Sequence, residues 1–402
     1  MNKKKCPICN SSKHLLIDKF SRGFLFTTKK FEKITFDKYI CSNCCHIFNK
    51  KIVNSDSINR HYQTARSNKI LSDYEYKKIS KSYYGELAKF ITKETNFNKN
   101  QKYIDIGCGK GYLLYSMQKV LKTNNLYGLD MSLDAKNLVS SKLKDKIITG
   151  DFLNFKNKKF DVISIISILE HFDNLNKPIK KSYECLNDDG YLCITVPDSM
   201  KILYDHEGRK FSFMHDLLNY EHNHHFNLKN LITLFEKNKF KLVNYRRVNR
   251  GIWDVMDVIF KKQSKRKKYY DIKKNHENYD AQSFVNYYNL KKEYYVSKFQ
   301  NKIKNKKLSI YGCGWWTTCV LTNFFDLKIK DIEEIIDKDL RKKKLKLFNK
   351  TIKQPDKIKN INNEIIVATL DSFDEIKKYL YGIYGYKIKL ISFENNKNSF
   401  LN

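Results

Sequence analysis

A short apolar segment followed by three closely spaced glycines does most to constrain the fold of this 402-residue chain. Residues 103–106 have the length and composition of a buried strand, and Gly107, Gly109 and Gly111 follow at once. Glycine adopts backbone conformations that other residues avoid and lets a ligand approach the main chain closely. The next residues are typical of a helix start, where free N–H groups can face a ligand. The pattern predicts a strand, a ligand-binding turn and a helix.

From about residue 101 to 260, strand-like segments alternate with helical ones, which predicts a parallel sheet covered by helices. Acidic residues stand at several predicted strand ends. Asp105 comes just before the first glycine, where a carboxylate can face a cationic ligand, and Asp130 ends the second strand, where it can accept both hydroxyls of a ribose. Asp151 could contact an adenine amine. Singly, each acid could be an ordinary strand-end or helix-cap residue.

Glycine turns of this kind occur in NAD-binding and methyltransferase folds alike. The ordered series of motifs over about 101–200 resembles the class I S-adenosylmethionine-dependent methyltransferases, whose fold is Rossmann-like α/β. The resemblance implies S-adenosyl-L-methionine as cofactor. It implies that the following residues bind it: Asp105, Gly107, Gly109, Gly111, Asp130, Asp151 and Phe152.

Two CxxC pairs near the start of the chain predict a metal site. Cys6 and Cys9 form one pair, and Cys41 and Cys44 form the other. Two such turns can close a tetrahedral site of four thiolates for Zn²⁺, with no open position for catalysis. We therefore expect structural zinc in a small β-ribbon domain, with Cys45 or His46 as alternatives to Cys44 for the fourth ligand.

A zinc-binding segment, a methyltransferase sheet and a further α/β unit together resemble the three-domain sugar C-methyltransferases, which modify nucleotide-linked keto-deoxysugars. That resemblance implies a nucleotide sugar as acceptor and a second Rossmann-like domain at the carboxyl end, opening at residues 311–317 and continuing at 336–339. Trp315 and Trp316 could stack on a base, or could be buried against the sheet. The expected domains are 1–50 (zinc-binding), 51–100 (helical connector), 101–260 (methyltransferase), 261–302 (helical linker) and 303–402 (Rossmann-like).

A histidine-rich segment follows the fifth predicted strand of the methyltransferase sheet. Four groups capable of acid or base chemistry lie between Glu221 and His225, which argues against an ordinary core segment. By the resemblance, Glu221 and His222 match a pair in which the histidine is the general base. Tyr220 is displaced by one position from the family's tyrosine, so methylation at carbon, oxygen or nitrogen stays open.

The histidine segment has two other interpretations. It could be a helix cap with surface histidines, or a second metal site at His222, His224 and His225, although no nearby acid has ligand spacing. Glu170 and His171, after the fourth strand, occupy a substrate-side position by the resemblance, or serve in capping or packing.

The net charge of +34 brings in nucleic acid as a possible partner. Lysine supplies nearly all of it, arginine is scarce, and residues 101–200 hold 14 lysines against 12 acids. A solvated lysine-rich surface therefore fits better than RNA methylation, which stays an alternative together with a non-catalytic cofactor-binding module. With no apolar leader and no apolar run long enough for a membrane span, we expect a cytoplasmic protein that uses a small-molecule acceptor. The oligomeric state cannot be derived from the sequence.

Overall fold

In the computed structural model the chain divides into two compact units, each built from three stretches of sequence. The first unit comprises Met1–His14, Ile40–Lys201 and Glu221–Tyr279, and the second comprises Leu15–Tyr39, Ile202–Tyr220 and Asp280–Asn402. The structure describes residues 5–24, 32–50, 72–156, 158–202, 217–250, 254–264, 280–314, 317, 332–347, 349–358, 361, 364–368 and 373–392.

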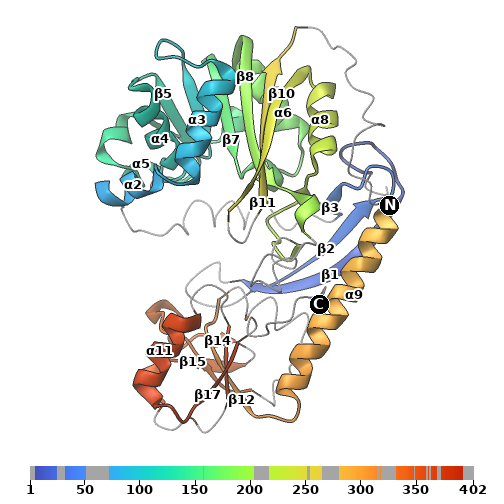
Figure 1. Ribbon diagram of the computed structural model, residues 1–402, viewed down its shortest axis with the longest axis vertical. Coiled ribbons are helices and arrows are strands. Elements are labelled where there is room, and N and C mark those ends of the chain that lie inside the picture. Colours follow the sequence, from blue (N-terminus) through green and yellow to red (C-terminus); the bar gives the residue numbers. More distant parts are fainter. Residues whose placement is uncertain are drawn as a thin grey trace. The chain divides into compact units, whose positions relative to one another are not determined.

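A seven-stranded sheet forms the centre of the first unit, in the order β10-β11-β8-β7-β4-β5-β6 (Figure 1). Strands β4 to β8 run parallel to their neighbours, and β8, β11 and β10 pair antiparallel. The bounds are β4 Tyr103–Ile106, β5 Leu126–Asp130, β6 Ile147–Thr149, β7 Phe160–Ile166, β8 Leu186–Pro197, β10 Phe240–Asn249 and β11 Asp254–Lys262. The expected all-parallel sheet is thus wrong for its last two strands. A connection of only four residues joins them, too short for a parallel crossover.

The strand order reverses between β4 and β7. From β4 the chain moves outward through β5 and β6, and then returns to the other side of β4 with β7 and β8. Such a reversal leaves a crevice at the carboxyl ends of the strands, where α/β sheets bind their ligands. The glycine turn follows β4 and so opens onto this point.

Helices cover both faces of this sheet. A buried core cluster joins α2, α3 and α4 to the strands, with Leu87, Leu114 and Ile259 among its members. Phe260 points to the opposite face because side chains alternate along a strand. There Phe235 stacks on it at 4.3 Å between ring centroids, so α8 covers that face. The bounds are α2 Asp73–Ile79, α3 Tyr83–Thr95, α4 Tyr112–Leu121, α5 Ala135–Leu138, α6 Asn176–Cys185 and α8 Leu228–Lys237.

Short elements complete the first unit. The strands β3 (Ile47–Asn49) and β9 (His224–His225) pair antiparallel. Short 3₁₀ helices are η1 Ser141–Lys146, η2 Phe152–Asn154, η3 Leu169–His171 and η4 Ser199–Lys201. The strands β1 (His14–Phe24) and β2 (Glu32–Cys41) are hydrogen-bonded neighbours and belong almost entirely to the second unit, so residues 1–50 are shared between the units. The five-domain division stays a prediction.

The second unit holds a six-stranded sheet in the order β14-β15-β13-β12-β16-β17. All neighbours are parallel except β14 and β15. The bounds are β12 Leu308–Tyr311, β13 Ile332–Ile336, β14 Lys346–Leu347, β15 Lys350–Lys353, β16 Glu364–Val367, β17 Lys389–Ser392, α9 Ala281–Ile303, α11 Phe373–Tyr384, η8 Leu340–Lys342 and η9 Pro355–Lys357. Trp315 and Trp316 lie outside the described residues.

A glycine turn follows β12 in the second unit and contacts the acid that follows β13. Gly312 has φ 96° and donates its N–H to the Ile336 carbonyl at 2.8 Å. Cys313 donates its backbone N–H to Oδ2 of Asp337 at 2.7 Å, and Oδ1 of Asp337 accepts from the Asp339 N–H at 2.8 Å. Strand, turn and acid are therefore fixed together by main-chain donors.

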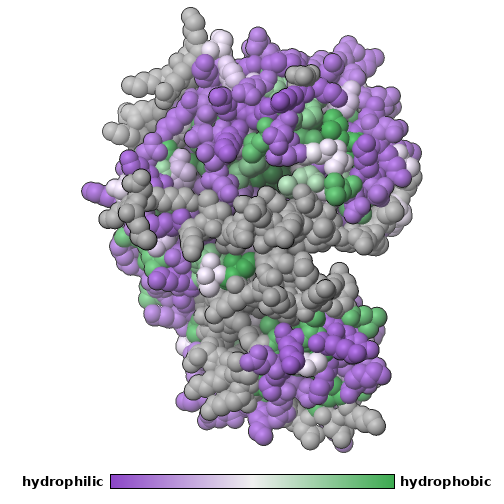
Figure 2. Space-filling view, turned by 180° about the vertical axis from the view of Figure 1, so that it is seen from behind, coloured by the Kyte–Doolittle hydropathy of each residue, from purple (hydrophilic) through white to green (hydrophobic). Residues whose placement is uncertain are grey.

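Hydrophilic side chains dominate the drawn surface of the face seen in Figure 2, as a lysine-rich composition predicts. Among the described residues, no helix combines the length and apolarity required to cross a membrane.

Candidate active site

The glycine turn after β4 is tied to the end of β5. Gly107, Gly109 and Gly111 have φ values of 68°, 55° and 70°, which favour glycine. Gly107 donates its N–H to the Leu129 carbonyl at 2.7 Å, and Gly109 donates to Oδ2 of Asp130 at 2.8 Å. The local sequence thus makes a turn that only glycines adopt without strain, and the second strand holds it in place.

Asp130 is fixed from two sides. Its Oδ1 atom accepts the Ser132 N–H at 2.9 Å while Oδ2 accepts from Gly109, and the side chain is 2% exposed. The two backbone donors fix the orientation of the carboxylate. The acid therefore stands preorganised at the carboxyl edge of the sheet.

Asp105 lies inside the sheet beside a hydroxyl pair. Ser164 donates to its Oδ1 atom at 2.5 Å, and the Ser164 and Tyr103 hydroxyls are 2.6 Å apart. Burial raises the pKa of Asp105 to about 7, although the Ser164 hydrogen bond lowers it and the charge of Asp130 raises it further. Asp105 is therefore poised between its protonated and charged forms near neutral pH.

The loop after β6 carries the two remaining residues predicted to bind cofactor. Asp151 is exposed and caps η2, since its Oδ1 accepts the Leu153 N–H at 3.0 Å, whereas Phe152 is buried. Since β4, β5 and β6 are adjacent and parallel, the predicted cofactor residues lie at the ends of these strands along one edge of the sheet, except Asp105, which is buried within β4. The glycine turn, Asp130 and Phe152 follow one another along this edge. Such an arrangement suits a nucleoside with a charged tail, and S-adenosylmethionine is a ligand of this kind.

Residues 78–245 match a family model described as a methyltransferase domain. This segment contains the whole strand edge described above. The segment is therefore similar to a methyltransferase domain. S-adenosyl-L-methionine, the cofactor expected from the sequence, is supported by this match.

An uncharacterized protein of Methanocaldococcus jannaschii is 33% identical over 124 residues, which are 30% of this chain and 47% of that protein. The ubiquinone biosynthesis O-methyltransferase of Glaesserella parasuis is 32% identical over 119 residues, 27% of this chain and 50% of that enzyme. The chain thus spans about half the length of these relatives. Magnesium protoporphyrin IX methyltransferase of Synechocystis, solved with bound S-adenosylhomocysteine, has 10% identity and a TM-score of 0.40, covering 52% of this chain and 100% of that one.

On the other side of β4, the end of β7 brings a second group of polar residues to the same edge. A side chain at Gly107 would come within 2.6 Å of the Ile168 side chain, so the glycine turn and the β7 exit loop are in contact. Glu170 and His171 follow Ile168 directly in η3. His222 packs edge-on against His171, with 5.0 Å between ring centroids. The ligand atoms of Glu170, His171 and His222 all lie within 4.8 Å of one another.

The sequence predicts that the histidine segment is not part of the buried core, and the structure shows that this prediction is wrong. His222, His224 and His225 are buried, and β9 pairs with β3. His46 stacks on His224 with its Nε2 atom 3.1 Å from Nδ1 of His224, and burial lowers the pKa of His46 to about 3. Surface histidines are thus excluded. These rings form a packed layer in which His46 is neutral.

The predicted trio of Tyr220, Glu221 and His222 takes three different environments. Tyr220 is fully buried and belongs to the second unit, where it lies 6.5 Å from Phe36 between ring centroids. The Glu221 carbonyl oxygen lies 3.1 Å from Nδ1 of His171. From the sequence, Glu170 and His171 are predicted as candidates separate from His222. The strand order could have joined them, because both segments follow neighbouring parallel strands, β7 and β8, and so meet at one edge.

The four cysteines of the two CxxC pairs do come together. The Sγ atoms of Cys6 and Cys44 are 3.6 Å apart, those of Cys9 and Cys41 are 3.5 Å apart, and all four lie within 4.8 Å. Hydrogen bonds from the Cys44 and Cys6 thiols lower the pKa of Cys41. Cys45 and His46 are outside this group.

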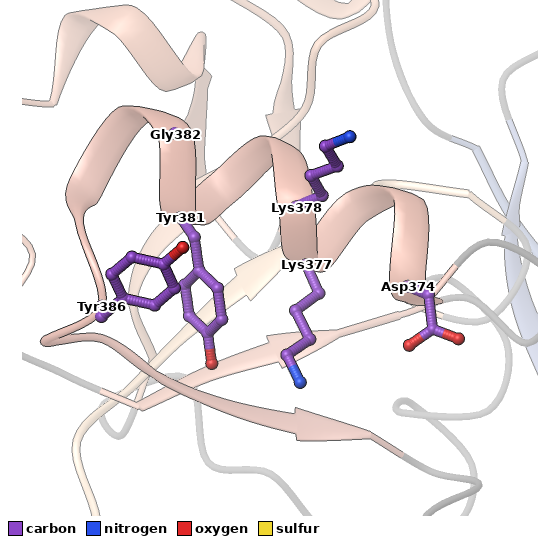
Figure 3. Close-up of a pocket in the computed structure, with 6 residues that line it drawn as sticks. All are labelled: Asp374, Lys377, Lys378, Tyr381, Gly382 and Tyr386. Atoms are coloured by element: carbon purple, nitrogen blue, oxygen red, sulfur yellow. The ribbon is translucent and has the colours of Figure 1, made fainter.

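A hollow beside α11 in the second unit is lined by Asp374, Lys377, Lys378, Tyr381, Gly382 and Tyr386 (Figure 3). Tyr386 is 87% exposed, and none of the residues predicted to be functional lies there. The hollow is a surface feature of the helix, and no role is assigned to it.

Proposed function

We propose that this protein transfers a methyl group from S-adenosyl-L-methionine to a small-molecule acceptor, a nucleotide-linked sugar in polysaccharide or glycoside biosynthesis. The observation that carries the methyl transfer is the hydrogen bond from the Gly109 N–H to the Asp130 carboxylate, which we call a bracket. It lies inside a segment that matches a methyltransferase domain. The relative named as an O-methyltransferase belongs to ubiquinone biosynthesis, so the proposed sugar acceptor rests on the three-part plan of the sequence.

The second unit supports a nucleotide-linked acceptor. Its turn after β12 has three backbone N–H donors arranged much as in the turn after β4: one bonds a carbonyl of the next strand and two bond the following acid. The first donor to the acid stands one residue after the glycine, at Cys313, and not two residues after it as at Gly109. In parallel α/β sheets such a turn and acid bind nucleosides. We propose that this unit is Rossmann-like and binds a nucleotide.

Zinc at the four cysteines forms part of the proposal. In a tetrahedral Zn²⁺ site with Zn–S bonds of about 2.3 Å, sulfur atoms stand about 3.8 Å apart. The measured separations of 3.5 and 3.6 Å are close to that value. With four thiolates and no open position, the ion would be structural. Lys237 of α8 donates to the Ile8 carbonyl at 2.5 Å and would tie the site to the methyltransferase sheet.

When bound, S-adenosylmethionine supplies an electrophilic methyl group on a positively charged sulfur. In the proposed mechanism, Asp130 accepts from the ribose hydroxyls and the glycine turn leaves room for the methionine end. Asp105, in its ionised form, would face the positively charged methionine end of the cofactor. The acceptor lies on the β7 side, where His222 takes its proton as the general base, with Glu170 and His171 beside it.

Isothermal calorimetry with S-adenosylhomocysteine on zinc-loaded protein tests the cofactor assignment. We expect one binding site per chain with a dissociation constant on the order of micromolar. Absence of binding would overturn the proposal. Mass spectrometry after incubation with a panel of nucleotide sugars then tests the acceptor. Tight cofactor binding without any methylated product would favour the non-catalytic module.

The RNA alternative is tested in the same preparation. Phosphate contacts by many lysines predict polyanion binding that weakens steeply with salt. Methylated RNA in place of methylated sugar would contradict the proposed acceptor, whereas weak and sequence-blind RNA binding at physiological salt would remove the alternative.

A further inference from the structure

We propose that Glu170, His171 and His222 bind one divalent transition-metal ion beside the cofactor turn, separately from the cysteine cluster. Their ligand atoms already lie within 4.8 Å of one another. Metal bonds of about 2.0–2.2 Å to histidine and carboxylate place neighbouring donors about 3 Å apart. Small side-chain rotations therefore suffice to close the site.

The backbone holds the two contributing segments against each other. After β7, the Ser167 N–H donates to the Thr195 carbonyl of β8 at 2.8 Å, which fixes the start of the loop that carries Glu170 and His171. Asn223, the neighbour of His222, donates from Nδ2 to the His171 carbonyl and to Oδ1 of Asp173, both at 3.0 Å. The loop that carries Glu170 and His171 is thus held by a main-chain bond at its start and by the Asn223 side chain at its end.

Asn223 is in turn held by β3. Nδ2 of Asn49 donates to Oδ1 of Asn223 at 3.1 Å, and the Asn49 N–H donates to the Asn223 carbonyl at 3.0 Å. In the Asn223 side-chain amide, the oxygen therefore accepts a hydrogen bond and the nitrogen donates two. Such second-layer hydrogen bonds orient metal ligands and contribute to metal affinity. We therefore class Asn49 and Asn223 as positioning residues.

Burial and donor chemistry favour a cation here. Glu170 is 1% exposed and His222 is 5% exposed. Two imidazoles and one carboxylate suit Mn²⁺, Fe²⁺, Co²⁺ or Zn²⁺, and three protein ligands leave positions open for another molecule. The cysteine cluster, in contrast, has four soft ligands.

The site would act on the acceptor. Ile168 packs against Gly107, so the ion would stand next to the methionine end of the cofactor turn. A bound divalent ion lowers the pKa of an oxygen that it coordinates. An acceptor hydroxyl on the ion would lose its proton to water. With the ion bound, His222 would be a ligand, and this role would replace the general-base role proposed above. This role rests on the proposed function, but the metal site itself does not.

Mn²⁺ is the probe, because it prefers nitrogen and oxygen ligands and competes poorly for four thiolates. Full-length protein with zinc in place is titrated with Mn²⁺, and free Mn²⁺ is followed by electron paramagnetic resonance. One Mn²⁺ per chain is expected. The near-isosteric variant Glu170→Gln and the variant His222→Gln should each weaken binding at least about tenfold, as lost metal contacts do.

His225→Gln is the matched control, since His225 is equally buried and its ring lies 5.8 Å from that of His222, but it is outside the group. Failure of the wild type to bind Mn²⁺ would overturn the inference, and so would equal losses in the control and in folded Glu170→Gln. S-adenosylhomocysteine binding is measured in the same samples. Retained cofactor binding without Mn²⁺ binding removes the metal site alone, whereas loss of cofactor binding in the wild type contradicts the proposed function.

Discussion

The backbone N–H of Gly109 donates to Oδ2 of Asp130 at 2.8 Å, so the glycine turn and the acid at the end of the next strand hold each other in place. The second unit has the same relationship between Cys313 and Asp337, at 2.7 Å. Each bracket joins the first two strands of a parallel sheet at their carboxyl ends. The pair offers a comparison between two similarly placed acids, of which Asp337 also forms an ion pair with Lys342 at 2.7 Å.

Replacing Asp130 with alanine should weaken S-adenosylhomocysteine binding by about 1–3 kcal/mol, or roughly fivefold to more than a hundredfold. The change removes a charged acceptor and leaves the Gly109 and Ser132 N–H groups without it. Isothermal calorimetry measures the effect. Asp337→Ala removes the equivalent bracket of the second unit and should leave this affinity unchanged. Equal losses in both variants would show that the bracket acts through general stability.

Ionisation of Asp105 should make the folded state less stable as the pH rises. The pKa is about 7 in the folded protein and about 3.9 in an unfolded chain. A raised pKa means that the folded state holds the proton more tightly. The contribution to stability is therefore complete below about pH 4 and is lost as the pH rises through 7, about 4 kcal/mol in total.

Urea unfolding between pH 5 and pH 8 measures this effect. Asp105→Asn removes the titrating group, so the variant should lack this part of the pH dependence. Parallel curves for wild type and variant across that range would contradict the assignment to Asp105.

Gly128→Ala should destabilise the first unit by about 1–3 kcal/mol, the usual effect of overpacking. The added methyl would lie 2.6 Å from Sγ of Cys108 and 2.7 Å from Cδ1 of Leu114. Gly150→Ala is the control, since its methyl would meet nothing closer than 3.9 Å. Denaturant unfolding followed by circular dichroism compares the two. A larger loss for Gly150→Ala would refute the packing argument.

Cys9→Ser should abolish the proposed zinc binding, which elemental analysis of the purified protein would measure. Loss of one of four thiolates opens the site, and structural zinc contributes directly to folding, so thermal stability should fall as well. Cys45→Ser should keep one zinc per chain, because Cys45 lies outside the cysteine group. Equal loss of zinc in Cys45→Ser would assign the fourth ligand to Cys45 instead of Cys44.

The sequence alone determined the glycine turn, its acid partner and the α/β alternation around them. These features are local. A backbone with positive φ requires glycine at that very position, and a short apolar segment that ends in an acid predicts the end of a buried strand. The match of residues 78–245 to a methyltransferase domain confirms the class that these signals predicted.

Only the tertiary structure decided what surrounds His222. The strand order brings the loop after β7 and the segment after β8 to one edge, and so sets Glu170 and His171 beside a histidine about fifty positions later. It also buries that segment, and it separates Tyr220 from His222 into another unit. Contacts between distant segments depend on which strands become neighbours. That choice follows from how the whole set of apolar faces is buried together, and no local pattern of residues carries it.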